Sequence, residues 1–474
     1  MIASEIRILS DDDQARVHDA ALAVLERRGV LVEEPLLREQ LKARGGTDGR
    51  NSGEILLPRE LVEECLLTAG REPVLYCVSG KALRHRASDR YYASIVTDPW
   101  IVDYREGLRK PRLDDIARHA RLSDALPLID NVHLMDDTVP ELDSATSELK
   151  CLEAFAANTT TSYHCAPGTL RGTRTWLDVA EIMAGGDLKR RPILMAYVPT
   201  VSPLTLTEQN VKQLRMFIER GAVCNLGPCA IGGATAPWPL AGLLAQSWAE
   251  FLLALVAAQV IQPGVPVLGS GGGAHPMDMA TGESLYSGVS KSLASAAVIE
   301  LCAWLDLPTI VGNYTTLCSN YGMQNGMESA LGVFATFFGR CNCFGSMGSI
   351  ANACGMSAAQ IVLHHDLAET LERFRRGIDV TDEKLAVDSI VAAGPRGQFL
   401  DDPLTLKYLR SDEHFFPPSM ERCAGGADVK TMAERAQERA EDLIASHKPA
   451  VPGDRLDEVR RYVATELRLI RGSE

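Results

Sequence analysis

The chain has 474 residues, of which 46% are hydrophobic and 23% are charged, which is the composition of a soluble globular enzyme with one large domain and extensions. Its formal net charge of -14 argues against a nucleic-acid-binding protein, because such proteins need a basic surface. No apolar run approaches the roughly 18 residues of a membrane span, and no signal-peptide pattern opens the sequence.

These features predict a cytoplasmic location with no membrane and no nucleic-acid partner. The chain holds 12 cysteines, too sparse for a disulfide scaffold, and we expect them to be reduced thiols.

Residues 1–111 are predicted to form a mainly helical N-terminal extension. Ser10 followed by Asp11, Asp12 and Asp13 is a helix start, since acidic side chains suit the positive end of a helix, and Gly29 ends the run. A second helix is expected over Pro58–Ala69. The segment Val74–Pro111 is rich in Tyr, Val and Ile and reads as irregular β structure.

From residue 112 to 400, short apolar runs alternate with helical segments, which indicates parallel βα units. The helical stretches include Leu206–Arg220, Leu240–Gln262, Ser284–Leu305 and Met327–Gly339. The candidate strands are Ile129–Met135, Thr161–Cys165, Ile193–Val198, Ala222–Leu226, Val265–Gly269, Thr309–Asn313 and Asn342–Phe344.

A closed (β/α)8 barrel is the natural arrangement of these units, with an eighth strand at Ala93–Val102 or in the C-terminal third. An open, doubly wound sheet is the alternative. Residues 401–474 are predicted to be a helical segment packed on the barrel, with long helices at Asp428–Ser446 and Asp454–Arg471.

Three motifs carry possible chemistry. Gly269-Ser-Gly-Gly-Gly-Ala274 fits a dinucleotide fingerprint, but Pro276 follows where a helix should begin, so a flexible loop at the barrel top is favoured. Cys341, Cys343, Cys318, Cys354 and the pair His364-His365 lack zinc-site spacing and read as core residues, so no metal is expected. Residues 221–242 combine a strand end with a loop of small residues and prolines, which leaves room above the barrel mouth.

Several motifs together resemble the trimethylamine methyltransferase superfamily over nearly the whole chain. They are His18 to Gly29, Pro199-Thr-Val-Ser-Pro-Leu204, Gly232-Gly-Ala-Thr-Ala-Pro237 with Leu240-Ala-Gly242, Pro263-Gly-Val-Pro-Val267, Met277-Asp-Met-Ala-Thr-Gly282, Gln324-Asn-Gly-Met-Glu328, and Arg376-Gly-Ile-Asp-Val380 with Phe399-Leu400.

The resemblance implies a barrel that binds a methylated amine and passes one methyl group to the Co(I) of a corrinoid carried by a separate protein. This chain itself is expected to hold no tight cofactor, and to form a homo-oligomer. Some family members carry pyrrolysine a few positions before the Gln-x-Gly-x-Glu motif, where this sequence has Ser319 or a neighbour. The similarity therefore points to the branch that demethylates quaternary amines, of the betaine type, without pyrrolysine.

The chemistry of that branch selects the candidate site residues. A quaternary ammonium departs as a neutral amine, so no catalytic acid or base is assigned, and the protein has to position the cation. Aromatic faces suit a trimethylammonium group, and polar groups suit a substrate carboxylate. The aromatic candidates are Trp238, Tyr314, Tyr321 and Phe344, the polar candidates are His164, Asn225, Asn313, Ser319, Gln324 and Glu328, and Gly271, Gly272 and Gly273 are expected where the corrinoid approaches.

The sequence departs from the family pattern at two positions near the expected site or its lid. Gly322 stands where an Asp is common, and Leu404-Thr405 stands where a His-Thr pair is frequent. The alternatives are a zinc-dependent corrinoid methyltransferase acting on a thiol or alcohol, and a non-catalytic barrel that binds a quaternary amine.

Overall fold

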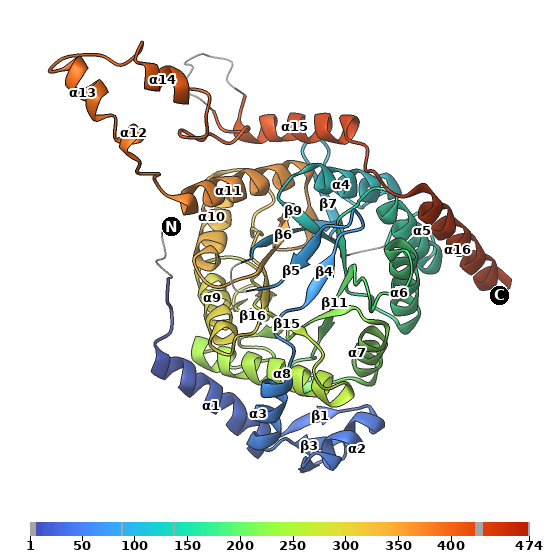
Figure 1. Ribbon diagram of the computed structural model, residues 1–474. Coiled ribbons are helices and arrows are strands. Elements are labelled where there is room, and N and C mark those ends of the chain that lie inside the picture. Colours follow the sequence, from blue (N-terminus) through green and yellow to red (C-terminus); the bar gives the residue numbers. More distant parts are fainter. Residues whose placement is uncertain (1–5, 87–88, 136–137, 422–429, 473–474) are drawn as a thin grey trace.

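The computed structural model describes residues 6–86, 89–135, 138–421 and 430–472 (Figure 1). A closed barrel of eight parallel strands forms its centre, and β20 pairs with β6 to close it. The strands follow chain order: β6 (Tyr91–Val96), β9 (Ile129–Leu134), β10 (Ser162–Cys165), β11 (Leu194–Pro199), β13 (Val223–Gly227), β15 (Val267–Ser270), β19 (Thr309–Gly312) and β20 (Cys343–Met347). The expected (β/α)8 barrel is confirmed, and the open-sheet alternative is wrong.

The barrel begins earlier than residue 112. Its first strand, β6, overlaps the Ala93–Val102 option for the eighth strand and lies inside the segment that the sequence assigned to the N-terminal extension. The sequence hides this boundary because β6 is separated from the next barrel strand by a strand pair, β7 (Trp100–Asp103) and β8 (Gly107–Arg109), and only then by a helix.

Each barrel strand is followed by one helix of the outer layer, as the alternating pattern predicts. These helices are α4 (Leu113–Ala125), α5 (Ser144–Ala156), α6 (Leu170–Ala184), α7 (Glu208–Arg220), α8 (Leu240–Ile261), α9 (Val289–Trp304), α10 (Met323–Phe337) and α11 (Ala358–Arg376).

Helix α8 corrects the expectation that no apolar run reaches membrane length. Its 22 residues are long and apolar enough to cross a membrane, but 72% of the apolar window is buried inside the protein. Within it, Glu250 is fully buried and its carboxylate accepts hydrogen bonds from Ser202 at 2.6 Å and from the Leu204 backbone N–H at 3.1 Å. A helix that buries a loop-anchoring carboxylate in this way is a core helix of a soluble protein.

The N-terminal segment covers one side and the bottom of the barrel. Helix α1 (Asp11–Arg27) begins with the predicted cap, in which the Ser10 hydroxyl accepts from the Asp13 N–H and the Asp13 carboxylate accepts from the Ser10 N–H. Helix α3 (Arg59–Thr68) matches the second expected helix, and α2 (Pro35–Ala43) was missed.

Short strand pairs tie this segment to the barrel. The hairpin of β4 (Val74–Tyr76) and β5 (Ala82–Arg84) places Leu75 and Leu83 against inward-facing barrel residues and closes the bottom. The other short strands are β1 (Val30–Val32), β2 (Thr47–Asp48), β3 (Glu54–Leu56), β12 (Thr205–Leu206), β14 (Ala230–Ile231), β16 (Ala274–His275), β17 (Met277–Asp278), β18 (Glu283–Ser284), β21 (Ser349–Ile350) and β22 (Gly355–Met356).

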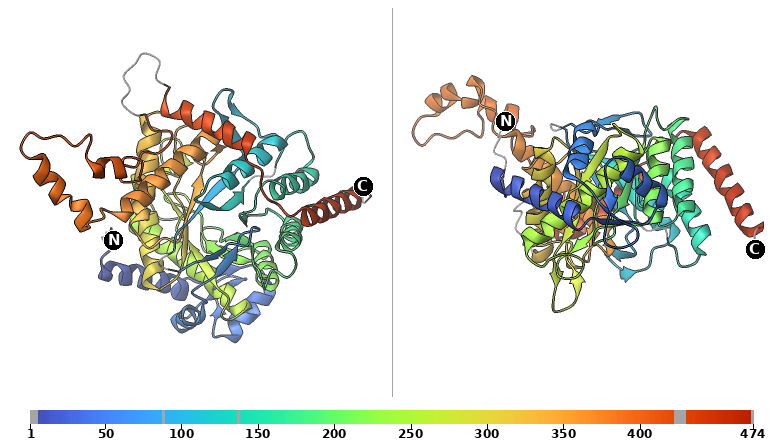
Figure 2. Two further views of the ribbon diagram at one scale, coloured as in Figure 1. Left: turned by 45° about the horizontal axis from the view of Figure 1, so that its top comes forward. Right: turned by 90° about the horizontal axis from the view of Figure 1, so that it is seen from below.

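The C-terminal part has two components. Residues 378–410 form an arm that projects from the end of α11 and contains α12 (Asp382–Leu385), α13 (Val387–Ala393) and α14 (Pro403–Tyr408) (Figures 1 and 2). Beyond it, α15 (Met432–Ser446) packs on α11 and α4, and α16 (Gly453–Gly472) packs on α5 and α6. The predicted start of the first C-terminal helix, Asp428, lies outside the described residues.

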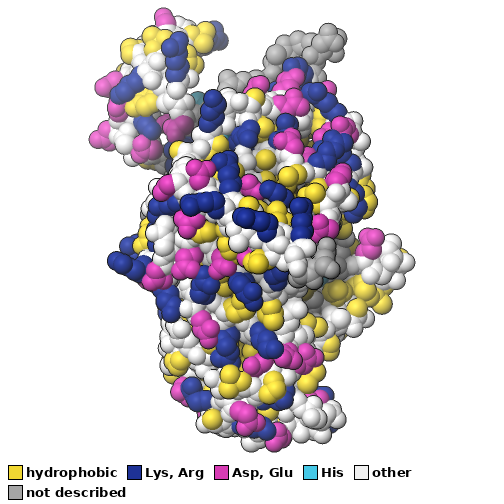
Figure 3. Space-filling view, turned by 90° about the vertical axis from the view of Figure 1, so that its right-hand side faces the viewer, with side chains coloured by type: hydrophobic (Ala, Val, Ile, Leu, Met, Phe, Trp, Pro, Cys, Tyr) yellow, Lys and Arg dark blue, Asp and Glu magenta, His cyan; other side chains and the backbone are white. Residues whose placement is uncertain are grey.

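The surface and the thiols agree with the composition. On the face seen in Figure 3, Lys and Arg side chains are interspersed with Asp and Glu. The cysteines in the described part of the chain are free thiols, most of them buried.

Candidate active site

A cavity of about 380 Å³ opens where the carboxyl ends of the barrel strands meet. Active sites of (β/α)8 enzymes lie at this end, because the βα loops that carry functional groups converge there. Every barrel strand contributes to the wall, with Ser94, His133, His164, Tyr197, Asn225, Ser270, Ile310 and Gly345 lining it from β6, β9, β10, β11, β13, β15, β19 and β20.

Two stacked histidines form one wall of the cavity. His133 and His164 are register partners on β9 and β10, and their ring centroids lie 3.9 Å apart at an interplanar angle of 20°. Burial lowers the pKa of His133 to about 3 and holds the pKa of His164 well below 6.5, so both imidazoles are neutral at pH 7.

Both histidines and the neighbouring Asn225 have side-chain atoms without a hydrogen-bond partner in the described chain. Within the described chain, Nε2 of His133, Nε2 of His164 and Oδ1 of Asn225 have no hydrogen-bond partner, although all three side chains are at least nine-tenths buried. Buried polar atoms are nearly always satisfied in folded proteins, so it is unusual that three residues lining one cavity each keep an unsatisfied one.

A buried carboxylate and two phenols also line the cavity. Asp98 follows β6, is fully buried, and its Oδ2 accepts a hydrogen bond from the Ser349 hydroxyl at 3.1 Å. The Tyr197 hydroxyl donates to the Gly227 carbonyl at 3.1 Å, and the ring of Tyr286 packs on His275 at 4.3 Å. Burial raises the pKa of both phenols, so they stay neutral.

Glycines keep the mouth open. At Gly272 the nearest heavy atom to an added Cβ lies 3.7 Å away, and this residue lines the cavity. The other two glycines of the turn serve packing instead: a Cβ on Gly271 would meet Val311 at 3.3 Å, and one on Gly273 would meet Pro228 at 2.8 Å. Of the glycines expected at the corrinoid approach, only Gly272 therefore faces the cavity.

A buried lysine holds this turn in place. The Lys291 ammonium, on α9, donates to the carbonyls of Gly272 and, at 3.1 Å, of Ala274. Burial lowers the pKa of Lys291 to about 7. Because α9 begins only at Val289, no helix N-terminus follows the glycines, and the loop is not a dinucleotide site.

Four of the predicted site residues lie elsewhere. Phe344 and Tyr314 are fully buried: Phe344 stacks on Tyr92 at 5.4 Å, and Tyr314 lies 5.2 Å from His364. The side-chain amide of Asn313 donates to the Gly332 carbonyl at 3.1 Å and so ties β19 to α10. Trp238 is 55% exposed, outside the cavity.

The Gln-x-Gly-x-Glu motif organises a loop. The Glu328 carboxylate accepts from the Leu317 backbone N–H at 2.7 Å and from the Gln324 amide at 2.8 Å. The Tyr321 hydroxyl lies 2.6 Å from that of Ser357, and Ser319 is exposed. None of these residues lines the cavity.

Of the predicted residues, the structure thus brings His164, Asn225 and Gly272 together, and sequence reasoning missed several neighbours. The missed residues are Asp98, His133, Tyr197, Tyr286, His275 and Ser346. A usable signal was present for some of them: His133 and Tyr197 lie near the ends of correctly predicted strands, where inward-facing side chains of a barrel reach the mouth.

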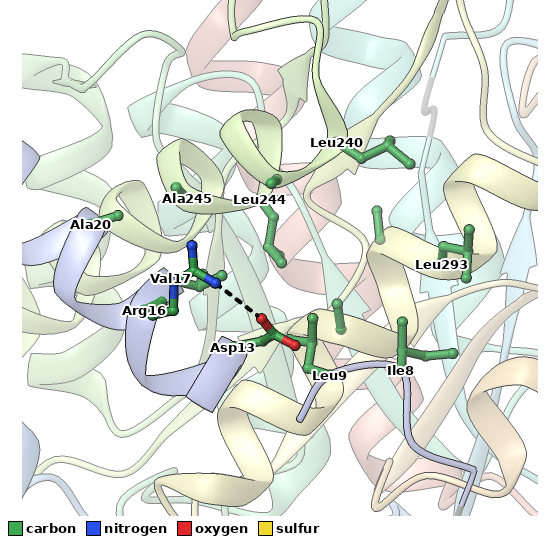
Figure 4. A pocket seen from close by; sticks show the side chains of 13 residues that line it. Ile8, Leu9, Asp13, Arg16, Val17, Ala20, Leu240, Leu244, Ala245 and Leu293 are labelled. Atoms are coloured by element: carbon green, nitrogen blue, oxygen red, sulfur yellow. Dashed lines mark ion pairs between the residues drawn. The ribbon is translucent and has the colours of Figure 1, made fainter. Parts of the chain in front are cut away.

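Two other candidate sites do not offer comparable chemistry. A cavity of about 420 Å³ between α1, α8 and α9 is lined by apolar side chains such as Leu9, Leu244 and Leu293, and its charged residues, Asp13 and Arg16, pair with each other at 3.6 Å (Figure 4). Among the described residues, one group of possible metal ligands was found, His365, Asp366 and Glu369 on α11. Arg439 already pairs with Asp366 at 2.6 Å.

Known proteins share both the sequence and the fold of this chain. The model of the trimethylamine methyltransferase (MTTB) family matches residues 2–469. The chain is 25% identical to the trimethylamine methyltransferase MttB of Desulfitobacterium hafniense, over 96% of this chain and 93% of that protein. It is also 25% identical to a glycine betaine methyltransferase of Desulfitobacterium hafniense, over 95% of each chain.

Two further proteins complete the comparison. The proline betaine:corrinoid methyltransferase of Eubacterium limosum is 24% identical over 96% of this chain and 97% of that protein. The crystal structure of the monomethylamine methyltransferase of Methanosarcina barkeri superposes with a TM-score of 0.52 at 11% identity, covering 97% of this chain and 88% of that one, which establishes the shared fold. This chain is therefore a methyltransferase that belongs to the trimethylamine methyltransferase (MTTB) family.

Proposed function

We propose that this enzyme takes a methyl group from a small quaternary amine that also carries a carboxylate, a betaine, and delivers it to the Co(I) of a corrinoid protein. The observation that carries the proposal is one cavity whose lining includes a buried carboxylate together with neutral hydrogen-bonding residues that keep unpartnered atoms. The glycine betaine and proline betaine methyltransferases among its relatives support the same choice.

The cationic end of such a substrate suits Asp98, Tyr197 and Tyr286, which also line the cavity. A trimethylammonium group donates no conventional hydrogen bond, so it is recognised by charge and by aromatic faces, each worth about 0.5–2 kcal/mol. Asp98 supplies the opposite charge in a buried setting, where screening by water is weak.

The carboxylate end suits His133, His164 and Asn225, which line the cavity from β9, β10 and β13. A neutral imidazole can carry its proton on Nε2 and donate it, and a side-chain amide turned about its last bond presents its NH2 group. A ligand carboxylate would accept from these groups and satisfy atoms that have no partner within the described chain.

The charge states of the cavity also suit a quaternary rather than a tertiary amine. A tertiary amine leaves well only when it is protonated or otherwise activated, whereas a quaternary ammonium departs as a neutral amine. The low pKa values of His133 and His164 and the raised pKa values of the tyrosines mean that these residues do not act as acids at neutral pH. Their task is to bind, orient and exclude water.

The methyl acceptor enters from outside the chain. A reduced corrinoid, presented by its carrier protein, supplies the strong nucleophile that receives the methyl group. Gly272, which lines the cavity and has no side chain, lets a bulky group approach the backbone at the mouth, and Lys291 fixes the backbone there. The position related to pyrrolysine, at Ser319 or a neighbour, holds an ordinary residue, which favours a substrate that needs no extra activation.

The decisive experiment supplies free cob(I)alamin or a reduced corrinoid protein together with a panel of amines. Glycine betaine, proline betaine and carnitine carry a carboxylate, choline lacks it, and trimethylamine lacks the quaternary charge. We expect loss of the Co(I) absorbance with at least one carboxylated quaternary amine, and with neither choline nor trimethylamine at comparable rates. Absence of methyl transfer from every quaternary amine would refute the proposal.

A further inference from the structure

The arm of residues 378–410 is folded but is not covered by its own chain. None of its residues is buried, and Ile378, Val391 and Leu400 are 90%, 74% and 86% exposed. Its other exposed apolar residues are Val380, Leu385, Val387, Ile390, Phe399, Leu406 and Leu409. Soluble monomers rarely expose so many large apolar side chains on one segment.

Local interactions give the arm a defined shape. Lys384 pairs with Asp379 at 2.9 Å and with Glu413 at 2.8 Å, and Lys407 pairs with Glu383. The Thr381 hydroxyl caps α12 and the Asp402 carboxylate caps α14. These charged side chains are therefore paired within the arm and at its base, whereas the apolar side chains are exposed to solvent.

A second unpartnered apolar surface adjoins the base of the arm. On α10, Met323, Met327, Leu331 and Phe334 recur at spacings of four, four and three, so they share one face, and they are 82%, 65%, 42% and 44% exposed. Phe338 links Phe334, at 4.7 Å between ring centroids, to Phe374 on α11, at 6.0 Å. We call this set, from Met323 to Phe374, the α10 stripe.

We infer that the arm of one copy of this chain packs on the α10 stripe of a second copy, and that the second arm returns the contact. A two-fold axis requires a surface that contains both halves of the contact, because each residue pair must occur twice. The stripe and the arm meet this requirement, since α11 carries Phe374 and then leads directly into Ile378 at the start of the arm.

The available area suits a stable dimer. Full burial of an aliphatic side chain removes on the order of 100 Å² of apolar surface from water, so the arm offers on the order of 600 Å². Two reciprocal contacts, each burying a comparable area on both partners, would then bury roughly 2,400 Å², which lies in the range of permanent homodimer interfaces. The stripe itself adds little charge to desolvate, because Glu328 is the only ionisable residue of α10 and is already bound to Leu317 and Gln324.

The test measures the mass of the full-length protein in solution by light scattering or sedimentation. An arm variant, V391D with L400D, and a stripe variant, M323D with M327D, each place two charges in the proposed contact. We expect the unmodified protein to contain an even number of copies and each variant to lose this pairing, with at least a 100-fold weaker dissociation constant. L67D is the matched control, because Leu67 is 82% exposed on α3, outside the arm and the stripe.

Mixing the two variants separates this arrangement from other modes of association. One copy would then supply an intact arm and the other an intact stripe, so one of the two contacts is restored and the mixture should pair. Circular dichroism checks that each variant folds, and replacement of residues 379–410 by a short Gly-Ser linker repeats the arm test without new charges. A monomeric unmodified protein, variants that still pair, or a mixture that stays monomeric would each overturn the inference.

Discussion

Asp98 has a specific place in the cavity, because its carboxylate is buried and held by Ser349. The variant D98N keeps the shape and can still accept that hydrogen bond, but it removes the negative charge. Loss of a charged partner costs about 1.5–3 kcal/mol, so we expect kcat/KM for a quaternary amine to fall roughly 10- to 150-fold.

The matched control for this prediction is D130N. Asp130 lies on the same barrel, as the second residue of β9, and pairs with Lys81 at 2.6 Å at the opposite end from the mouth. Steady-state kinetics should give D130N the same kcat/KM for the quaternary amine as the unmodified enzyme. An equal loss in both variants would assign Asp98 a structural role only.

His164 allows the two ends of the substrate to be tested separately. In H164F a ring still stacks near His133, but the unpartnered nitrogen is gone. We expect affinity for carboxylated quaternary amines to fall about tenfold, since a hydrogen bond to a charged group is lost, while binding of choline is unchanged or improved. Calorimetric titration with glycine betaine and choline measures both, and a parallel loss for the two ligands would contradict the carboxylate assignment.

At the scale of elements, the loop after β19 connects α10 to the cavity. Glu328 holds the Leu317 N–H at one side of this loop. At the other side the Thr315 hydroxyl donates to Ser349 at 3.2 Å, and Ser349 in turn donates to Asp98. The Gln-x-Gly-x-Glu motif is therefore linked to Asp98 through hydrogen bonds at both sides of this loop, although it does not line the cavity.

This connection predicts the behaviour of two variants of Glu328. E328A leaves the Leu317 N–H without its acceptor, and we expect a loss of about 1–3 kcal/mol in the free energy of unfolding, with reduced activity. E328Q retains a carbonyl oxygen for that N–H and should recover most of the stability. Urea unfolding of the two variants decides the point, and equal stability of E328A and the unmodified protein would contradict it.

Strand geometry also explains why Phe344, one of the aromatic candidates, does not line the cavity. Phe344 and Gly345 are consecutive on β20, so they face opposite sides of the strand. Gly345 lines the cavity, and Phe344 packs behind the barrel wall. A shift of one residue thus separates a site residue from a core residue. Strand limits known only to within a residue or two cannot decide between them.

At the scale of the whole molecule, buried neutral histidines predict acid sensitivity. Burial lowers the pKa to about 3 for His133, His364 and His365 and to about 4 for His85 and His119. Below pH 6.5 the unfolded chain binds protons at these positions and the native protein does not. Stability is therefore fully present above pH 6.5 and falls as the pH is lowered towards 4.

Thermal unfolding between pH 7.5 and pH 5 measures this effect, with H85F as the variant. Neither ring nitrogen of His85 has a hydrogen-bond partner among the described residues, and its ring packs on Tyr91 at 5.1 Å. We expect H85F to have the melting temperature of the unmodified protein at pH 7.5. Between pH 7.5 and pH 5, its melting temperature should fall less than that of the unmodified protein. A melting temperature that falls more steeply with pH in H85F than in the unmodified protein would contradict the expected effect of His85.

Regular local patterns allowed much of the fold to be predicted from the sequence. The capped start of α1, the helices α7 to α10 and seven barrel strands follow from apolar periodicity and turn residues, which are properties of short segments. For the eighth strand the sequence offered two positions, Ala93–Val102 or the C-terminal third, and did not decide between them. The strand is β6, and its neighbours in the barrel are β9 and β20, of which β20 lies some 250 residues away in the sequence.

The sequence by itself therefore determined the barrel and the family. Only the tertiary structure decided which side chains share the cavity, bringing Asp98, His133, Tyr197 and Tyr286 beside His164 and Asn225, and moving Trp238, Tyr314 and Phe344 away. The physical reason is that closure of the barrel fixes which face of each strand points inward. That choice depends on pairing between distant strands, which no local pattern records.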